Sequence, residues 1–240
     1  MISYIYFESW RGAYSLVKVL FRFSRLYGTL FAMQEVLEIL QKKLQNRTSP
    51  LRIGIDLDGV VIDHTQAFLC ACGEFGYHLE SWQVNSNMLK HFLPKEIHTS
   101  IKRLVYTERR LEASPMQGSL EAVLALLAPS FDLIIASVQK EEEAEERLWT
   151  WLGTCGFSEH IPKDRVHIFR SREEKVSYLQ GLDLDFFIDD GTDVLEPLIG
   201  KTAPILFDPA EIHKRISIPE GIYVVEGWHE IREIFGASTQ

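Results

Sequence analysis

The stretch LRIGIDLDGVVID, residues 51–63, decides the predicted fold of this chain. Its apolar start, residues 51–55, is typical of a buried parallel strand, because helices cover such a strand on both faces. Asp56 and Asp58 follow where this strand ends. Open α/β sheets bind ligands at the carboxyl ends of their strands, so we expect both carboxylates to lie at a binding site.

A second acidic cluster follows the apolar run 186–188 and contains Asp189, Asp190 and Asp193. If both runs are strands of one parallel sheet, the two clusters meet at one edge. Carboxylates that meet there resist ionisation unless a cation lies among them, and hard oxygen ligands suit Mg²⁺. The sequence therefore predicts a magnesium site, although the second cluster could instead cap a helix that begins near Asp193.

Strand-like and helix-like segments alternate from residue 51 onward, which indicates an α/β fold with a doubly wound, largely parallel sheet. The predicted strands cover residues 51–56, 131–136, 165–169, 185–188, 204–207 and 223–225. The segment 66–115 is mostly helical in pattern, with a break at Pro94. It is too long for an ordinary crossover, so we assign it as a small helical cap beside the site. The core domain then comprises residues 51–65 and 116–240.

Residues 1–50 form a separate N-terminal extension, basic and rich in aromatic side chains. Lys18, Arg22 and Arg25 interrupt its apolar runs, so no membrane span is predicted. Three interpretations are open: a helix packed on the domain, which we favour, an amphipathic helix on a membrane surface or protein partner, or sequence upstream of a true start at Met33. The oligomeric state is not predicted.

The charge distribution bears on the partner. The net charge of the chain is −9. Residues 1–50 have a net charge of +4, so residues 51–240 have a net charge of −13. Such an acidic body repels a nucleic-acid polymer, so we expect a small phosphorylated metabolite as substrate. The odd number of cysteines, Cys70, Cys72 and Cys155, favours reduced thiols in a cytoplasmic protein.

Polar residues follow the predicted strands in a set order: Asp56, Ser137, Lys175 and the pair Asp189-Asp190. Together with the D-x-D-G-V sequence after an apolar strand, this order resembles the haloacid dehalogenase superfamily of phosphatases and phosphotransferases. The resemblance covers about residues 51–236 and implies a Rossmann-like sheet. The short helical cap is further similar to that of the cytosolic type C 5′-nucleotidases.

The resemblance implies that Asp56 attacks phosphorus and forms an aspartyl-phosphate. Asp58 would protonate the leaving oxygen and then activate water, which requires a carboxyl group whose proton affinity is raised by its surroundings. The family's dehalogenases lack this second aspartate, so hydrolysis of a phosphoester is favoured. Lys175 would neutralise charge between nucleophile and phosphate, a role that Lys140 or Arg172 could also fill.

The resemblance also implies the groups that bind the phosphoryl oxygens and the metal. The Ser137 hydroxyl and the backbone N–H groups around Leu57, Gly59 and Val138 would donate hydrogen bonds to phosphate. Mg²⁺ would be held by the Asp56 and Asp189 carboxylates and the Asp58 carbonyl, with Asp190 or Asp193 orienting bound water. Several of these residues have a simpler interpretation, because Asp58-Gly59 could be only a turn and Ser137 only a helix cap.

Neighbouring residues are harder to assign. His64 could line the mouth of the site or be a packed histidine. In the cap, Arg109 and Arg110 could grip a second anionic group, and aromatic residues could stack on a nucleobase or simply form the core of the cap.

The sequence thus predicts a Mg²⁺-dependent phosphatase for a small phosphomonoester, with a nucleoside monophosphate as one candidate. A sugar-phosphate or phosphoglycolate-type phosphatase is the alternative within the enzymes. A non-catalytic phosphate-binding or scaffold protein on the same fold is the alternative from another class, which the complete D-x-D sequence disfavours.

Overall fold

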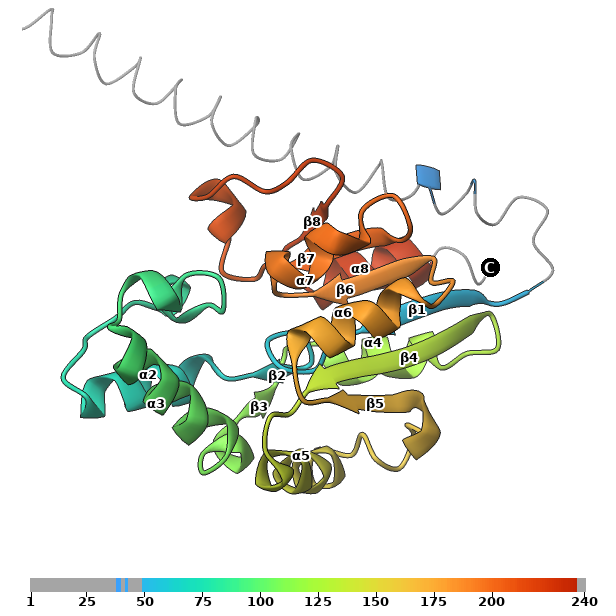
Figure 1. The fold of residues 1–240 in the computed structure, drawn as a ribbon. Coiled ribbons are helices and arrows are strands. Elements are labelled where there is room, and N and C mark those ends of the chain that lie inside the picture. Colours follow the sequence, from blue (N-terminus) through green and yellow to red (C-terminus); the bar gives the residue numbers. More distant parts are fainter. Residues whose placement is uncertain (1–37, 40–41, 43–48, 237–240) are drawn as a thin grey trace, which may run out of the picture.

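The computed structural model describes residues 38–39, 42 and 49–236 of the chain (Figure 1). The interpretations of the N-terminal extension fall largely outside this part. Among the described residues, no helix is long and apolar enough to cross a membrane.

Six parallel strands form the central sheet, in the order β5-β4-β1-β6-β7-β8. β1 lies between β4 and β6, so the two strands that carry the acidic clusters are direct neighbours. The predicted doubly wound parallel sheet is therefore confirmed. The strands are β1 Leu51–Ile55, β4 Phe131–Val138, β5 Val166–Phe169, β6 Phe186–Asp189, β7 Ala203–Phe207 and β8 Tyr223–Val225.

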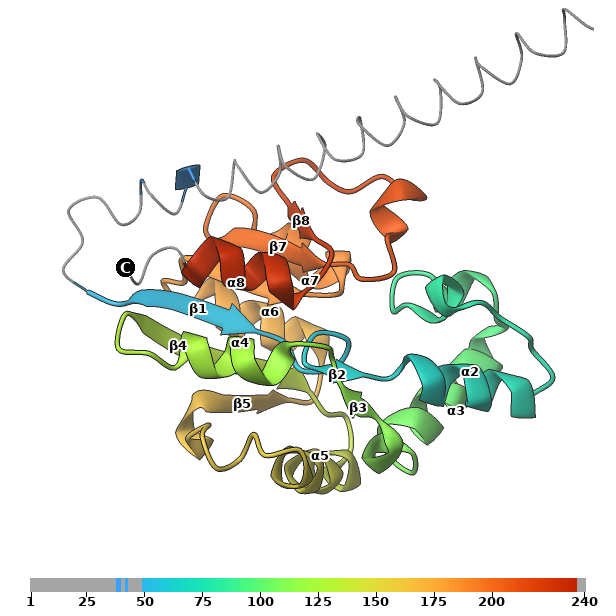
Figure 2. The same ribbon diagram turned by 180° about the vertical axis from the view of Figure 1, so that it is seen from behind.

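Helices cover both faces of this sheet (Figures 1 and 2). In β6, Phe186 and Ile188 belong to the core cluster that includes α4, α5 and α8, whereas Phe187 belongs to the cluster with α6 and α7. Because both faces are buried, the strands need apolar residues at successive positions, which explains the continuous apolar runs in the sequence. The helices are α4 Ser119–Leu126, α5 Glu142–Thr154, α6 Arg172–Gln180, α7 Thr192–Leu195 and α8 Trp228–Gly236.

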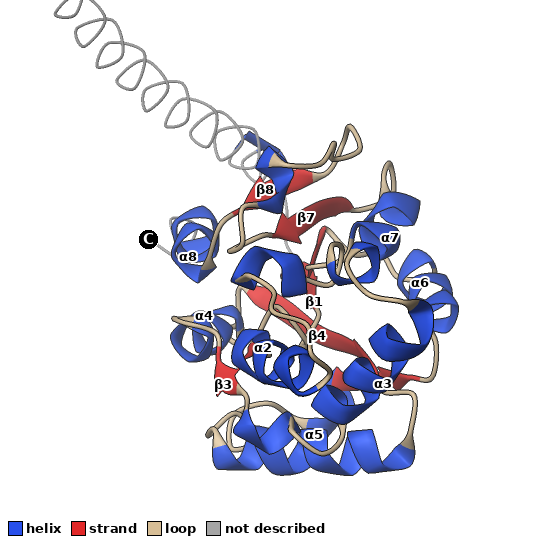
Figure 3. Ribbon diagram, turned by 90° about the vertical axis from the view of Figure 1, so that its left-hand side faces the viewer, coloured by secondary structure: helices blue, strands red, loops and turns tan. Residues whose placement is uncertain are grey.

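Residues 62–115, between β1 and α4, form the cap, which lies in front of the sheet in Figure 3. It has a hydrophobic core of its own, to which Phe68, Ile101 and Val105 contribute. A short antiparallel pair of strands, β2 and β3, joins it to the core domain. Its elements are β2 Ile62–Asp63, α2 Thr65–Glu74, the 3₁₀ helices η1 Ser81–Val84 and η2 Leu89–His91, α3 Lys95–Tyr106, the 3₁₀ helix η3 Arg110–Glu112, and β3 Ser114–Pro115.

Two local features differ from the sequence prediction. The cap is less helical than expected before Pro94, because the Asn85 side chain accepts a hydrogen bond from the Asn87 backbone at 2.9 Å and favours a turn there. β4 is two residues longer than predicted and ends at Val138, so Ser137 lies inside the strand rather than after it. The break at Pro94 is confirmed, since α3 begins directly after it.

Candidate active site

Asp56 and Asp189 lie side by side at the carboxyl edge of the sheet. Ile55 and Ile188 are partners in the β1–β6 register, and the Asp56 N–H donates a hydrogen bond to the Ile188 carbonyl at 2.9 Å. One carboxylate oxygen each of Asp56, Asp189 and Asp190 lies within 4.8 Å of the other two. The structure thus brings residues of both acidic clusters into one group.

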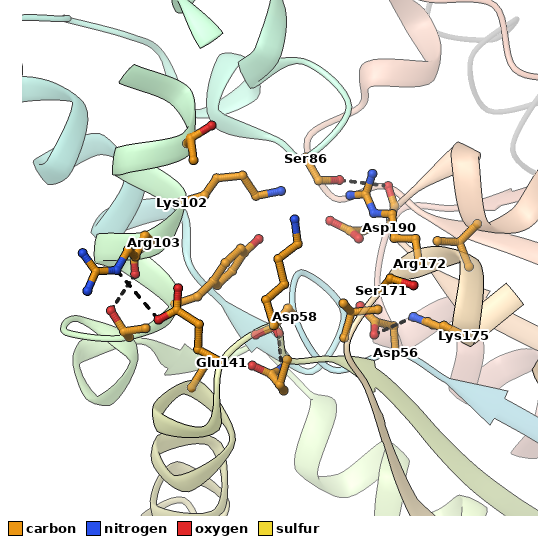
Figure 4. Close-up of a pocket in the computed structure, with 18 of the residues that line it drawn as sticks. Asp56, Asp58, Ser86, Lys102, Arg103, Glu141, Ser171, Arg172, Lys175 and Asp190 are labelled. Atoms are coloured by element: carbon orange, nitrogen blue, oxygen red, sulfur yellow. Dashed lines mark hydrogen bonds and ion pairs between the residues drawn. The ribbon is translucent and has the colours of Figure 1, made fainter. Parts of the chain in front are cut away.

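Lys175 bridges two of these carboxylates from the first half of α6 (Figure 4). Its Nζ donates to Asp56 Oδ1 and to Asp189 Oδ2, each at 2.7 Å. Burial alone would lower the pKa of Lys175, but Asp189 and Asp56 outweigh burial and raise the pKa. The ammonium therefore stays charged, and neither Lys140 nor Arg172 occupies this position.

The pKa values of two carboxyl groups in this cluster, Asp56 and Asp190, are raised. For Asp56, burial is the largest cause and Asp189 adds to it, although Lys175 opposes the rise. Burial and Asp189 raise the pKa of Asp190 to about 7. A divalent cation would favour the ionised form of these groups, and carboxylate oxygens are the donors that Mg²⁺ prefers. The residues present therefore fit a magnesium ion held by Asp56, Asp189 and Asp190.

Asp190, rather than Asp193, belongs to this group. Asp193 is paired with Arg172, and its side chain is 45% exposed. Asp190 packs against the turn after β1, because a Cβ atom added to Gly59 would lie 2.2 Å from Asp190 Oδ2. Gly59 also has a φ angle of +86°, so both the backbone conformation and the close approach of Asp190 require glycine there.

Asp58 lies in a different network. Arg110 Nη1 and Nη2 donate to its two carboxylate oxygens at 2.8 and 3.2 Å, and Gln139 Nε2 donates to Oδ2 at 2.8 Å. His64 Nε2 lies 2.7 Å from Oδ1, so the tautomer with a proton on that nitrogen would donate a hydrogen bond to Asp58. The Arg110 side chain is completely buried, so this is an enclosed bidentate ion pair.

These contacts overturn one sequence-based expectation. Burial by itself would raise the pKa of Asp58, but Arg110 and His64 outweigh it and lower the pKa below the usual range of a carboxyl group. The resemblance implied the opposite, a carboxyl group with raised proton affinity. The reason is that Arg110, 52 residues away in sequence, supplies a buried positive charge that the D-x-D sequence does not reveal.

The expected phosphate-binding groups are only partly accessible. Val138 lines the pocket, whereas the Ser137 hydroxyl is buried and accepts a hydrogen bond from Gln139 Nε2 at 2.8 Å. The Gly59 N–H already donates to the Ile62 carbonyl at 2.9 Å. Leu57 is buried, and its carbonyl accepts hydrogen bonds within the same turn. Gln139 thus lies between Ser137 and the pocket.

The pocket has a volume of about 530 Å³ and is formed by both the cap and the core domain. Its lining includes Asp56, Asp58, Lys175, Asp189 and Asp190. Sequence reasoning gave no role to several other basic or polar residues of the lining, among them Lys102, Gln139 and His98. Gln139 could have been noticed as the residue directly after β4, but Lys102 and His98 lie in α3, whose pattern shows only an amphipathic helix.

The cap also contacts the loop that follows β6. Asn87 Nδ2 donates to the Asp190 carbonyl at 2.6 Å, and the Thr192 N–H donates to Asn87 Oδ1 at 3.2 Å. The position of the cap is therefore coupled to the loop that carries Asp190.

Several known proteins are similar to this chain. No family profile matches the sequence. A protein of Bacillus cereus named "Putative nucleotidase" is 24% identical over 203 residues, which cover 77% of this chain and 97% of that protein. A haloacid dehalogenase family hydrolase from Deinococcus radiodurans, solved with bound phosphate and sodium, has a TM-score of 0.50 at 17% identity and covers 79% of this chain and 97% of its own. A haloacid dehalogenase-like protein from Streptococcus pneumoniae has a TM-score of 0.51 at 16% identity, with coverages of 79% and 100%.

The parallel sheet order and the helical segment inserted after β1 define an α/β fold with a Rossmann-like sheet and a cap. More particularly, the fold is that of the haloacid dehalogenase-like hydrolases, and the resemblance drawn from the sequence is confirmed at that level.

Proposed function

We propose that this protein is a Mg²⁺-dependent phosphatase that hydrolyses a small phosphomonoester through an aspartyl-phosphate on Asp56. The observation that carries the proposal is the position of Lys175, which contacts both Asp56 and Asp189 beside Asp190. A carboxylate nucleophile, a fixed positive charge and three possible metal ligands thus meet at one point of the pocket. The haloacid dehalogenase-like fold and the order of the motifs support it.

Asp56 is held in one orientation. Its backbone N–H is bonded to β6 and its Oδ1 to Lys175, whereas Oδ2 has no hydrogen-bond partner in the part of the chain that is described. Oδ2 would form the bond to phosphorus while the bond from phosphorus to the ester oxygen breaks. Lys175 would lower the repulsion between the carboxylate and the phosphate. When bound by Asp56, Asp189 and Asp190, Mg²⁺ would supply charge neutralisation at the phosphoryl oxygens.

The contacts of Asp58 suit the second half of this reaction better than the first. An ionised carboxylate can take a proton from the water that attacks the phosphoenzyme. To protonate the leaving oxygen in the first half, this carboxyl group would first have to gain a proton, which its contacts with Arg110 and His64 disfavour. We therefore expect esters with acidic alcohols, which leave readily without a proton, to be the better substrates.

The test is phosphate release from a chromogenic aryl phosphate with and without Mg²⁺. Replacing the nucleophile, Asp56→Asn, should lower the rate by at least about 10³-fold. Asp183→Asn is the matched control, because Asp183 is an exposed aspartate away from the pocket. Turnover at the wild-type level by Asp56→Asn would refute the mechanism. Tight binding of phosphate mimics without any turnover by the wild type would instead favour the non-catalytic alternative.

A nucleoside monophosphate is the substrate class favoured by the Bacillus cereus relative. The pocket volume exceeds what a phosphate group alone needs. A panel of nucleoside 5′-monophosphates and sugar phosphates, compared by kcat/KM, separates this candidate from a sugar-phosphate or phosphoglycolate-type phosphatase.

A further inference from the structure

Basic side chains gather in the pocket from three separate elements. Lys102 comes from α3 of the cap, Lys140 from the loop after β4, and Arg172 from the start of α6. Figure 4 shows Lys102 and Arg172 reaching toward each other from opposite sides of the pocket. The cap and the core domain therefore both contribute positive charge to one region.

Two of these side chains lack an anionic partner. Arg172 is paired with Asp193, and Arg103, beside Lys102 in α3, is 3.8 Å from Glu141. By contrast, the amines of Lys102 and Lys140 form no ion pair or hydrogen bond with any residue that the structure describes. The Lys102 amine lies 5.5 Å from the centroid of the Tyr106 ring, which is a cation–π contact and not an ion pair.

The electrostatics of this region are those of crowded positive charges. The pKa of Lys102 is lowered, first by burial and then by Arg172, with Asp190 opposing and Lys140 adding to the effect. The pKa of His98 is lowered as well, first by burial and then by Lys102 and Arg172. An anion placed among these side chains would remove the repulsion and give the Lys102 amine a partner.

The chemistry at Asp56 does not use this charge. Lys175 already contacts the nucleophile, and the three carboxylates account for the metal. A phosphomonoester with an uncharged remainder would leave the amines of Lys102 and Lys140 without an anionic partner in the pocket. The positive charge of Lys102 and Lys140 is therefore available to a second anionic group of the substrate.

We propose that the substrate carries a second anionic group, which binds among Lys102, Lys140 and Arg172 while its scissile phosphate lies at Asp56. This inference rests on the proposed phosphatase function and narrows its substrate class to phosphomonoesters with a second carboxylate or phosphate. A nucleoside monophosphate meets this condition only if its base or sugar carries a further anionic group.

The kinetic test compares substrates that differ only in the second anion. Phosphoglycolate against ethyl phosphate tests a carboxylate, and a nucleoside 3′,5′-bisphosphate against the 5′-monophosphate tests a second phosphate. In at least one pair we expect kcat/KM to be higher for the doubly anionic substrate. Lys102→Met should lower kcat/KM for that substrate about tenfold and change it less than about twofold for its singly anionic partner.

Two further variants control for charge and folding. Lys95→Met removes an exposed lysine from the same helix outside the pocket and should leave both members of each pair unchanged. Lys102→Arg keeps the charge and should keep the preference. Lys140 is exposed, so Lys140→Met provides a second variant for the same kcat/KM comparison if Lys102→Met folds poorly.

A binding measurement separates failure of this inference from failure of the phosphatase function. Calorimetry with Mg²⁺ compares 3-phosphonopropionate with propylphosphonate, and 1,3-propanediphosphonate with the same reference; none of these can be hydrolysed. Tighter binding of a doubly anionic ligand that disappears in Lys102→Met supports the subsite even if no ester is turned over. Equal binding by both members of each pair, or an equal loss for both in Lys102→Met, would overturn it.

Discussion

Asp56 and Asp58 are separated by one residue, yet they lie in opposite electrostatic surroundings. Asp56 shares its site with two other carboxylates and one lysine, and its pKa is raised, mainly by burial. Asp58 lies against Arg110, His64 and Gln139, and its pKa is lowered despite burial. The D-x-D sequence therefore determines the positions of the two carboxyl groups in the chain. Residues from distant elements determine whether each group is more stable protonated or ionised.

The largest expected effect tests the Asp56 side of this comparison. Lys175→Met removes the positive charge between Asp56 and Asp189 and should lower kcat for phosphate release by about 10³-fold, because nucleophile and phosphate then repel each other. The variant also leaves buried carboxylates without their partner, so Mg²⁺ should raise its melting temperature more than that of the wild type.

Thermal denaturation of both proteins with and without Mg²⁺ checks the second expectation. Lys163→Met is a suitable control, since Lys163 is exposed in the 3₁₀ helix before β5. A Lys175→Met protein with near wild-type activity would show that another cation serves the nucleophile.

A smaller effect is expected on the Asp58 side. Arg110→Met removes the main cause of the lowered pKa of Asp58, so that pKa should rise. The base form of Asp58 is then lost at a higher pH than in the wild type, and the acid limb of the kcat profile should move upward. Breaking this buried pair should also cost about 3 kcal/mol of unfolding free energy.

The lowered pKa of Asp58 also makes the stability of the folded protein depend on pH. With a pKa lowered in the folded state, Asp58 contributes stability that is present above its unfolded pKa and is lost as the pH falls through the folded one. Arg109→Met is the matched control, because Arg109 pairs with Glu74 at the edge of the cap rather than with Asp58. If the acid limb of the kcat profile stays at the wild-type pH in Arg110→Met, Asp58 is not the group that takes the proton in the rate-limiting step.

The sheet and the meeting of the acidic clusters were predictable because they depend on local patterns. Continuous apolar runs mark strands buried on both faces, and the carboxyl ends of neighbouring parallel strands meet at one edge. The pairing of Lys175 with Asp56 could be expected only through the family resemblance, since nothing in the sequence around Lys175 distinguishes it from Lys140.

The surroundings of Asp58 were not predictable from such patterns. Arg110 looked like a candidate for gripping a second anion, but the return of the chain through η3 and β3 buries it against Asp58 and Gln139. The burial of the Ser137 hydroxyl has a similar cause. β4 is longer than its apolar run, and Gln139 donates a hydrogen bond to this hydroxyl. In both cases the contact depends on a side chain from another part of the chain, Arg110 for Asp58 and Gln139 for Ser137. The spacing of apolar residues in the sequence does not predict such a contact.

The smallest expected effect concerns which carboxylates share the site of Asp56. Asp193→Asn should change kcat and the Mg²⁺ concentration for half-maximal activity by less than about twofold, because an exposed ion pair contributes about 0–1 kcal/mol and Asp193 lies outside the three-carboxylate group. Asp190→Asn, three residues earlier, should raise that Mg²⁺ concentration by about 10–100-fold. A Mg²⁺ titration of activity for both variants makes the comparison. Equal losses in the two would mean that the loop after β6 rearranges when the metal binds and that Arg172 releases Asp193.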